Sequence, residues 1–331
     1  MHLPGGRQVC GGFKPEFFDM LLRKHLQYFK SSACIIFIKL IFNNMKTVLS
    51  QNNYGKSAIR VLKVKRSTPV HEIKEFTVNV MLEGDFDAVH TNGDNSKVLP
   101  TDTMKNTVYA LAKDHPVNSI EEFGLHLAKY FQKNNSQVSK VSIEIEEKLW
   151  HRILTLDSSS KKSVSHDHSF VSGSNEKKTS NIVVTNNDSM IKSGIKDLLI
   201  LKSSGSGFEN YIKDKFTTLK ETSDRVFSTS VKAVWSYVNQ DLNFVSIHSR
   251  VRQIILETFA NQQSLSVQQT LFYVGKNILE VCKEVSEISL TMPNKHYLPF
   301  NLEQFGMENN NEIFIPTDEP FGLIEATLKR E

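Results

Sequence analysis

The stretch that decides the fold is Phe76-Thr77-Val78-Asn79-Val80-Met81-Leu82, where Phe, Val, Val and Leu occupy every second position. Alternation of this kind predicts a β-strand with one buried face. The segment before it, Ile59–Arg66, mixes apolar and basic residues in near-alternation and predicts a second strand. We expect the two segments to form a strand pair that starts the sheet of the protein.

Two helices are expected after this strand pair. The first is Thr103–Lys113, and the second is Ser119–Lys133, where Ser119 fits the N-cap position and Glu122 completes a capping box. In both segments the apolar residues recur at the spacing that gives a helix one buried face. The residues predicted to lie on these faces are Met104, Val108, Leu111, Ala112, Phe123, Leu127, Ala128 and Phe131.

Two further strands complete the first half of the chain. Val138–Ile145 alternates as a half-buried strand should, and Val164–Val171 predicts another strand. The latter lies between two loops rich in Ser and Lys, Asp157–Lys162 and Ser172–Ser180. The first half therefore has the predicted order of two strands, two helices and two strands.

The second half repeats this order coarsely, with different residues and three predicted strands after its helices. The segments predicted as strands are Lys196–Lys202, Arg225–Val238, Ile288–Met292, Asn311–Pro316 and Leu323–Lys329, and those predicted as helices are Leu242–Phe259 and Val267–Val285. Each half thus predicts an α+β unit, an antiparallel four-stranded sheet with both helices on one face. Two such sheets with strongly apolar helix faces suggest assembly into a closed ring of subunits.

Composition excludes several classes of protein. Of the 331 residues, 39% are hydrophobic and 23% charged, which suits a globular protein of two domains or one large one. A net charge of only +4 gives no basic surface for nucleic acid. The three cysteines, Cys10, Cys34 and Cys282, form no Cys-x-x-Cys pair and are too scattered for a disulfide framework. A reducing intracellular compartment is therefore expected.

The first 45 residues differ from the rest of the chain. Their apolar run, Ala33–Phe42, is interrupted by Lys39 and is shorter than the ~20 residues that a membrane-spanning helix needs. It also lacks a small-residue cleavage site, so it does not fit a signal peptide, and no membrane association is expected. Two interpretations stay open: an added helix that packs on the protein, or translated sequence outside the functional chain. Met45 stands where a conventional start would fall.

Polar groups gather at six junctions between predicted elements. Junctions carry function more often than element interiors, because a rigid scaffold aims their side chains. Each alone has an ordinary structural explanation, such as an N-cap, a solvated lysine or a surface arginine. The six segments are Tyr54-Gly55-Lys56, Pro100-Thr101-Asp102, Ser206-Gly207-Phe208, Thr217–Arg225, Ser266-Val267-Gln268 and Met292–Tyr297.

Together these segments resemble the urate oxidase (uricase) family in order and spacing. The most specific strings are Phe216-Thr217-Thr218-Leu219-Lys220-Glu221-Thr222 and Pro293-Asn294-Lys295-His296-Tyr297, with Val267-Gln268 between them. The resemblance covers residues 46–331 and leaves residues 1–45 as an atypical N-terminal extension. It implies two tunnelling-fold (T-fold) domains, 46–188 and 189–331. It also implies a homotetrameric barrel with active sites between subunits.

The resemblance assigns a substrate-binding role to a set of residues whose chemistry suits urate, a flat anionic purine. Arg225 presents a planar fork for bidentate contact with one edge of the ring, and the amide of Gln268 suits the opposite edge. Phe208 can stack on the purine face. The backbone N–H groups of Val267 and Asp102 would donate to polar atoms of the ring.

The resemblance also assigns the catalytic steps. Lys56 and Thr101 would remove a proton from urate, the amine taking the proton of the hydroxyl. His296 would complete a proton relay with water, while Thr101 and Asn294 would hold dioxygen above the ring. The substrate supplies the electrons, so no cofactor and no metal is expected. The expected products are 5-hydroxyisourate and hydrogen peroxide.

One departure from the family concerns the end of the chain. Many members end in a peroxisomal tripeptide of the Ser-Lys-Leu type, whereas this chain ends Leu328-Lys329-Arg330-Glu331. The resemblance implies the peroxisome, and the missing tripeptide leaves a cytoplasmic location as the other expectation.

Other classes of protein stay open at this stage. A different T-fold enzyme acting on a pterin or purine would need a zinc site or an acidic anchor, which metal analysis would detect. A non-catalytic purine-binding relative would bind urate without consuming it. His166-Asp167-His168 places two imidazoles on one face of a strand, but without a third ligand at a convincing spacing we favour solvated or hydrogen-bonded histidines.

Overall fold

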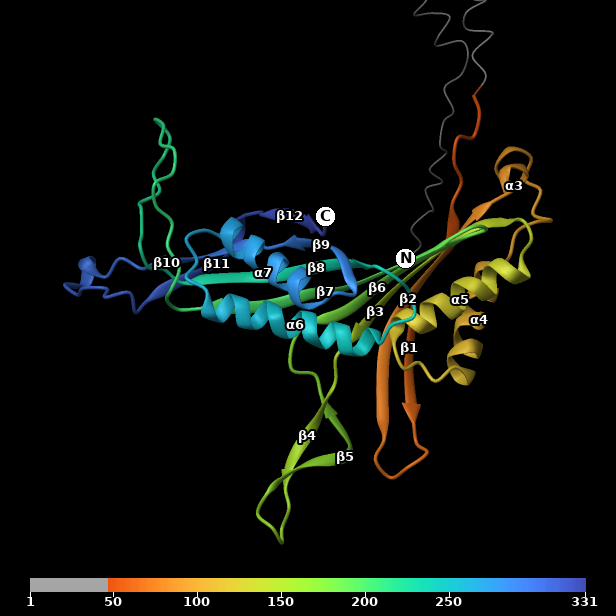
Figure 1. Ribbon diagram of the computed structural model, residues 1–331, viewed down its shortest axis with the longest axis horizontal. Helices are drawn as coiled ribbons and strands as arrows, with labels where there is room; N and C mark the ends of the chain where they lie inside the picture. The colour runs from red at the N-terminus through yellow and green to blue at the C-terminus, as the bar shows by residue number, and fades with distance from the viewer. Residues whose placement is uncertain (1–46) are drawn as a thin grey trace, which may run out of the picture. The chain divides into compact units, whose positions relative to one another are not determined.

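The computed structural model describes residues 47–331 (Figure 1). The predicted N-terminal extension, with its apolar run Ala33–Phe42, lies outside the described residues. Within residues 47–331, no helix is long and apolar enough to cross a membrane.

The first half of the described chain builds four antiparallel strands in the order β1-β2-β3-β6. Helices α4 and α5 pack against these strands, as their apolar faces predict. Strands β4 and β5 pair only with each other and form a separate two-stranded sheet. The elements are β1 (Tyr54–Lys65), β2 (Glu72–Gly84), α3 (Asp87–Thr91), α4 (Thr101–Asp114), α5 (Ile120–Asn134), β3 (Val138–Lys148), β4 (His151–Leu156), β5 (Ser163–Val171) and β6 (Lys177–Thr185).

The second half repeats this arrangement with strands in the order β7-β8-β9-β12. Helices α6 and α7 cover it, and the hairpin β10–β11 joins the beginning of β8 through the pair Lys295 and Ser228. The elements are β7 (Ser189–Lys202), β8 (Phe227–Tyr237), α6 (Phe244–Asn261), α7 (Val267–Val281), β9 (Val285–Thr291), β10 (Asn294–Pro299), the 3-10 turn η2 (Glu303–Phe305), β11 (Phe314–Gly322) and β12 (Glu325–Lys329).

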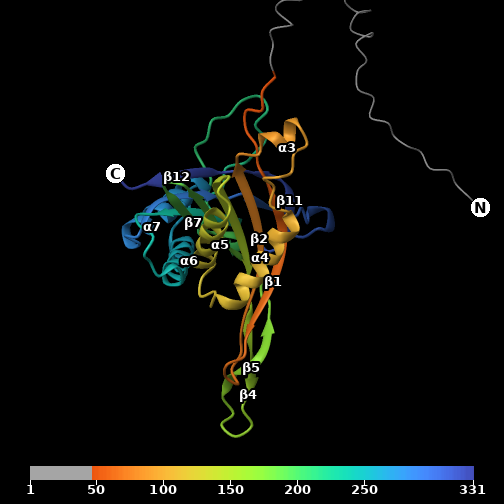
Figure 2. The same cartoon turned by 90° about the vertical axis from the view of Figure 1, so that its right-hand side faces the viewer.

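Strands β6 and β7 pair with each other, so the two halves share one continuous antiparallel sheet. The four long helices lie along one face of this sheet (Figures 1 and 2). The opposite face is polar, as strand alternation requires when one side is not covered. Residues that line this polar face include Thr77, Asn79, Glu144, Glu146, Asn181 and Lys192. The predicted α+β architecture is confirmed.

The core consists of two clusters of buried apolar side chains, one for each half. In the first, Phe76 of β2 packs edge-on against Phe123 of α5, with ring centroids 5.5 Å apart. In the second, Trp235 of β8 is buried beneath α6. The capping prediction also holds, since Ser119 Oγ accepts a hydrogen bond of 3.1 Å from the Glu122 N–H. These clusters fix the helices against the strands, and with them the element ends that carry the site residues.

The last strand of the first half was predicted wrongly. Val164–Val171 forms β5, which pairs with β4 instead of joining the main sheet, and the fourth strand of the first half is β6, Lys177–Thr185. The predicted loop Ser172–Ser180 overlaps the beginning of β6. The polar start of this strand hid its alternation, which is carried by Ser180, Ile182 and Val184 on the buried face.

A second correction concerns the segment after β9. The segment Met292–Tyr297 was predicted as a junction, but its residues from Asn294 onward belong to strand β10, which extends to Pro299 and pairs with β11. Other boundaries shift by a few residues: α7 ends at Val281, and β8 begins at Phe227, so Arg225 lies just before this strand. Arg225 therefore belongs to the loop that follows β7, where a side chain can be aimed at a ligand.

Candidate active site

Four of the predicted site residues line one cavity of about 290 Å³. They are Phe208, Arg225, Asn294 and His296. The cavity lies between the long loop that joins β7 to β8 and the hairpin β10–β11, two segments far apart in sequence. The fold thus brings together a stacking ring, a guanidinium, an amide and an imidazole.

Arg225 is the main charged group of this cavity with unused hydrogen-bonding capacity. Its Nε atom is shielded from solvent and has no hydrogen-bond partner among residues 47–331. Its guanidinium carbon lies 5.6 Å from the centroid of the Phe208 ring. Burial lowers the pKa of Arg225, although a guanidinium remains charged at neutral pH. Since buried donors are normally paired, this group is prepared for an acceptor that a ligand would bring.

The Phe208 ring is held by its backbone and by a neighbouring ring. Phe208 N–H donates to the Thr222 carbonyl at 2.7 Å, and Thr222 N–H donates back at 3.2 Å. Tyr211 stacks on Phe208 with ring centroids 4.9 Å apart and planes 13° apart. The Tyr211 hydroxyl donates to the Leu219 carbonyl at 2.6 Å. Sequence reasoning missed Tyr211, because this pairing spans a loop without periodicity.

Val267 and Gln268 open helix α7 beside the same loop. Ser266 caps the helix by accepting from Gln269 N–H at 3.1 Å, so the N–H groups of the first turn point outward without helical partners. Gly207 N–H donates to the Ser264 carbonyl at 2.8 Å and so joins the loop to this helix start. Val267 is buried and Gln268 is exposed. Neither is among the residues that line the cavity, but this hydrogen bond ties the loop that carries Phe208 to the segment just before them.

Asn294 and His296 come from β10. In the hairpin Asn294 pairs with Gly322 and His296 pairs with Thr317, with a register shift between them. Thr317 Oγ1 donates to the His296 carbonyl at 3.2 Å, while the neighbouring Lys295 forms an ion pair of 2.7 Å with Asp318. These contacts leave the Asn294 amide and the His296 imidazole at the wall of the cavity.

Lys56, Thr101 and Asp102 form a second group at the other end of the sheet. Lys56 lies on β1 opposite Val80, and Thr101 is the first residue of α4. Asp102 accepts hydrogen bonds from Lys105 at 2.5 Å and from Asn106 at 3.2 Å. The pKa of Asp102 lies below its usual value, chiefly because of the hydrogen bond from Lys105, and the charge of Lys56 adds to this lowering.

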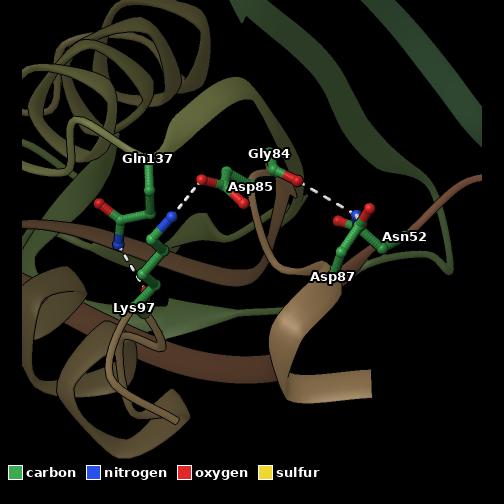
Figure 3. A network of polar contacts seen from close by, with 6 residues as sticks. All are labelled: Asn52, Gly84, Asp85, Asp87, Lys97 and Gln137. Atoms are coloured by element: carbon green, nitrogen blue, oxygen red, sulfur yellow. Dashed lines mark hydrogen bonds and ion pairs between the residues drawn. The ribbon is translucent and has the colours of Figure 1, made fainter. Parts of the chain in front are cut away.

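Two sets of contacts brace this second group. The Tyr54 hydroxyl accepts from Leu99 N–H at 2.9 Å, which ties the beginning of β1 to the loop that precedes Thr101. Figure 3 shows the other set. Asn52 donates to the Gly84 carbonyl at 3.1 Å, and Lys97 forms an ion pair with Asp85. The backbone carbonyl of Lys97 accepts a hydrogen bond from Gln137 at 2.7 Å. The contacts of Leu99 and Lys97 hold the loop that precedes Thr101 to the strand ends around it.

The two groups do not meet within one chain. Lys56 lies on β1, whereas the cavity lies beside the beginning of β8, and four strands separate β1 from β8 in the sheet (Figure 1). Five strand spacings of about 4.8 Å amount to roughly 24 Å along the sheet. A single two-ring purine is shorter than that separation and cannot bridge it.

His166 and His168, the two histidines considered as metal ligands, are not part of a metal site in the described residues. The rings of His166 and His168 lie edge to face with centroids 4.6 Å apart. Within residues 47–331, no group of three or more His, Cys, Asp or Glu side chains is arranged to hold a metal ion.

Comparison with known proteins decides the family. The family model for uricase matches residues 52–183 and 191–325, which is most of the described chain. The chain belongs to the uricase family. The uricase of Arthrobacter globiformis is 41% identical over 286 residues, covering 86% of this chain and 91% of that protein. The uricase of Dictyostelium discoideum is 39% identical over 287 residues, covering 85% of this chain and 97% of that protein.

Solved uricase structures share this fold. The crystal structure of uricase from Arthrobacter globiformis aligns with a TM-score of 0.81, covering 87% of this chain and 96% of that chain. A uricase structure from Bacillus fastidious aligns with a TM-score of 0.73 at 24% identity and bears on the fold alone. The resemblance and the tandem T-fold architecture predicted from sequence are both confirmed.

Proposed function

We propose that this protein is a urate oxidase. Urate, dioxygen and water are converted to 5-hydroxyisourate and hydrogen peroxide, so that urate loses two electrons, dioxygen gains them, and water supplies the new hydroxyl group. Membership of the uricase family supports the substrate. The observation that carries the proposal is the Arg225 Nε, a buried donor without a partner in the described chain, beside a ring suited to stacking.

Recognition of the purine follows from the groups around the cavity. The Arg225 guanidinium donates two parallel hydrogen bonds to one edge of the anionic ring, and Phe208 packs against its face. The outward N–H of Val267 and the amide of Gln268 address the remaining polar edge. Burial of Arg225 strengthens its interaction with an anion, because water competes less for the guanidinium.

Proton transfer belongs to the other group. Lys56 accepts the proton of the Thr101 hydroxyl, which in turn deprotonates urate. The resulting dianion is electron-rich enough to pass an electron to dioxygen, so the proposed reaction needs no cofactor. Asn294 and Thr101 hold dioxygen above the ring, and His296 relays protons to and from water.

The site is completed by a second copy of the chain. Lys56, Thr101 and Asp102 of one subunit then face the cavity of another, which places each active site between subunits of a homotetramer. The separation of roughly 24 Å within one chain supports this arrangement, because the two groups have to act on the same ring.

The direct test is turnover of urate by the purified full chain. Loss of the ultraviolet absorbance of urate, uptake of dioxygen and release of peroxide should occur together, and xanthine should not be consumed. Activity should survive thorough chelation. A protein that binds urate without consuming it would contradict the proposed reaction, and activity that returns only with added metal would contradict its cofactor-free form.

A further inference from the structure

The segment Ser204–Phe208 lies between two of the groups that recognise the purine. Arg225 N–H donates to the Ser206 carbonyl at 2.7 Å on one side of the segment. On the other side, Ser264 N–H donates to the Gly205 carbonyl at 2.9 Å, next to the start of α7. The segment therefore sets the spacing between Arg225 and the helix start, and it carries Phe208 at its end.

This segment has little intrinsic stiffness. Gly205 adopts a φ of 74°, in the left-handed region that favours glycine. Gly207 approaches the opposite backbone closely, because a Cβ on it would lie 3.0 Å from the carbonyl oxygens of Thr222 and Ser223. Two glycines permit this backbone conformation but also many others, so contacts with other residues are needed to select it.

The carboxylate of Asp224 is placed to do so. Its Oδ1 accepts from Gly205 N–H at 2.8 Å, and its Oδ2 accepts from the Ser204 hydroxyl at 2.9 Å. The Asp224 carbonyl is held in turn by the Thr222 hydroxyl at 2.7 Å. The hydrogen bond from Ser204 contributes most to a pKa of Asp224 below its usual value, so the group is ionised at neutral pH.

We propose that Asp224 is a positioning residue for purine binding. By anchoring Ser204 and Gly205, its carboxylate fixes the Phe208 ring, the Arg225 guanidinium and the Val267 N–H in the arrangement that one flat anion can contact simultaneously. The inference rests on the proposed function and adds to it a residue of the cavity wall whose two carboxylate oxygens both accept hydrogen bonds from the loop. Loss of the anchor leaves each binding group present but lets their spacing vary, which costs affinity through lost pre-organisation.

The kinetic signature of this role differs from that of a damaged fold. Groups that bind the ring equally in the ground state and the transition state affect KM and leave kcat unchanged. A protein that is merely less stable has fewer working sites, so its apparent kcat falls while its KM stays the same. The split between KM and kcat therefore separates positioning from stability.

The test uses three variants of the full chain with urate. Asp224→Ala removes both acceptors and should raise KM about tenfold with kcat within about twofold. Asp224→Asn keeps an acceptor for Gly205 and can donate to the Ser204 hydroxyl, so its KM should stay within about threefold of wild type. Ser204→Ala loses one of the two bonds and should also raise KM, by about threefold.

The matched control is Asp214→Ala in the same loop. Asp214 accepts from Phe216 N–H and from the Thr217 hydroxyl, both at 2.9 Å, but it does not hold Ser204–Phe208. KM should be unchanged in this variant. An equal rise in KM would mean that general loosening of the loop, and not the Asp224 anchor, weakens binding.

A double variant gives the decisive comparison. If Asp224 acts through the recognition groups, Asp224→Ala should raise the KM of Arg225→Ala by clearly less than its own tenfold, because coupled residues lose their shared contribution once. Full additivity, a normal KM in Asp224→Ala, or equal losses in Asp224→Asn and Asp224→Ala would each overturn the inference. Any of these results with an active wild type would leave the proposed function intact, whereas a wild type that does not consume urate would overturn both.

Discussion

The cavity group and the Lys56 group lie in different halves of the chain and differ in how their side chains are surrounded. Around the cavity, Arg225 and Phe208 are enclosed by the loop, the helix start and the hairpin β10–β11. Lys56 and Thr101 sit where β1 begins and α4 starts, braced from behind by Tyr54 and Asn52. The same basic unit therefore carries a binding cavity in one half and a pair of half-buried polar residues in the other.

This difference indicates that two halves with the same fold can serve different steps, recognition in one and proton transfer in the other. Both halves place site residues at the ends of strands and helices, but only the second has a long loop between its first two strands and a hairpin paired with the second of them, β8. Enclosure favours recognition, since it removes water from charged contacts. Under this interpretation, substitutions in the two groups should change different kinetic constants.

The largest effect is expected in the Lys56 group. Lys56→Ala should lower kcat by about 10²–10⁴-fold with little change in KM, because proton transfer contributes to the chemical step and not to binding. Thr101→Ala should fall in the same range, and the double variant should lose little more. Steady-state urate kinetics measure all three, with Lys65→Ala on the same strand as the control. A raised KM with normal kcat would move Lys56 to the recognition group.

The second largest effect is expected in the cavity group. Arg225→Ala should raise KM by roughly 150-fold, equivalent to about 3 kcal/mol, because it removes a charged bidentate contact from a partly buried site. Arg225→Lys keeps the charge without the planar fork and should recover only part of the loss. Gln268→Ala, at an exposed position, should have a smaller effect. Equal KM values for Arg225→Ala and wild type would remove the distinction between the groups.

Mixing variants tests whether the two groups meet across chains. At urate concentrations near the wild-type KM, neither Lys56→Ala nor Arg225→Ala has an efficient site alone, but a pair containing one of each keeps one intact site. Random assembly makes about half of the pairs mixed, and each mixed pair has one intact site out of two. About a quarter of all sites are then intact, so about a quarter of wild-type activity should return. Co-expression with different affinity tags allows the mixed species to be isolated and assayed. A mixture no more active than its parents would place both groups in sites within one chain.

The smallest effect is expected at the seam between the halves. Ser193 of β7 donates to the buried carboxyl of Glu121 on α5, and Tyr237 donates to Ser193 at 2.7 Å. Burial raises the pKa of Glu121, so the native state favours its neutral form and loses stability as pH rises through that pKa. Glu121→Gln keeps an acceptor without a charge.

Glu121→Gln should therefore raise the free energy of unfolding by about 1 kcal/mol at neutral pH. The gain should disappear below the pKa of an unfolded glutamate, about 4.3. Urea unfolding at two pH values measures the change, and KM and kcat should remain those of wild type. A variant less stable at neutral pH would show that the charge of Glu121 is compensated in the native state.

Local patterns predicted the helices well and some strands poorly. The α5 cap at Ser119 follows from a capping box within four residues, and the helix faces follow from regular spacing. Strand β6 was missed because its first residues are polar and its partners, β3 and β7, decide its placement. Strand β10 was missed because Pro293 and the polar residues after it are typical of a junction, and only pairing with β11 makes them a strand.

The site shows the same limit. Family resemblance named the residues, but sequence alone could not bring the loop between β7 and β8 against the hairpin β10–β11. Tyr211 and Asp224 had no assigned role, since their partners are set by the path of an irregular loop. Contacts of this kind depend on tertiary packing, which no periodicity records.

The pairing of β6 with β7 has a consequence for the way this chain comes apart. The two strands are joined by a short turn, in which Thr185 N–H donates to the Asp188 carbonyl at 2.8 Å, and eight residue pairs link them. Tyr237 packs against both buried clusters. If one half melted, the other would be left with an unpaired strand edge and an uncovered apolar seam, both of which invite aggregation. Heat should therefore disrupt the two halves in a single cooperative transition despite their separate clusters of buried side chains.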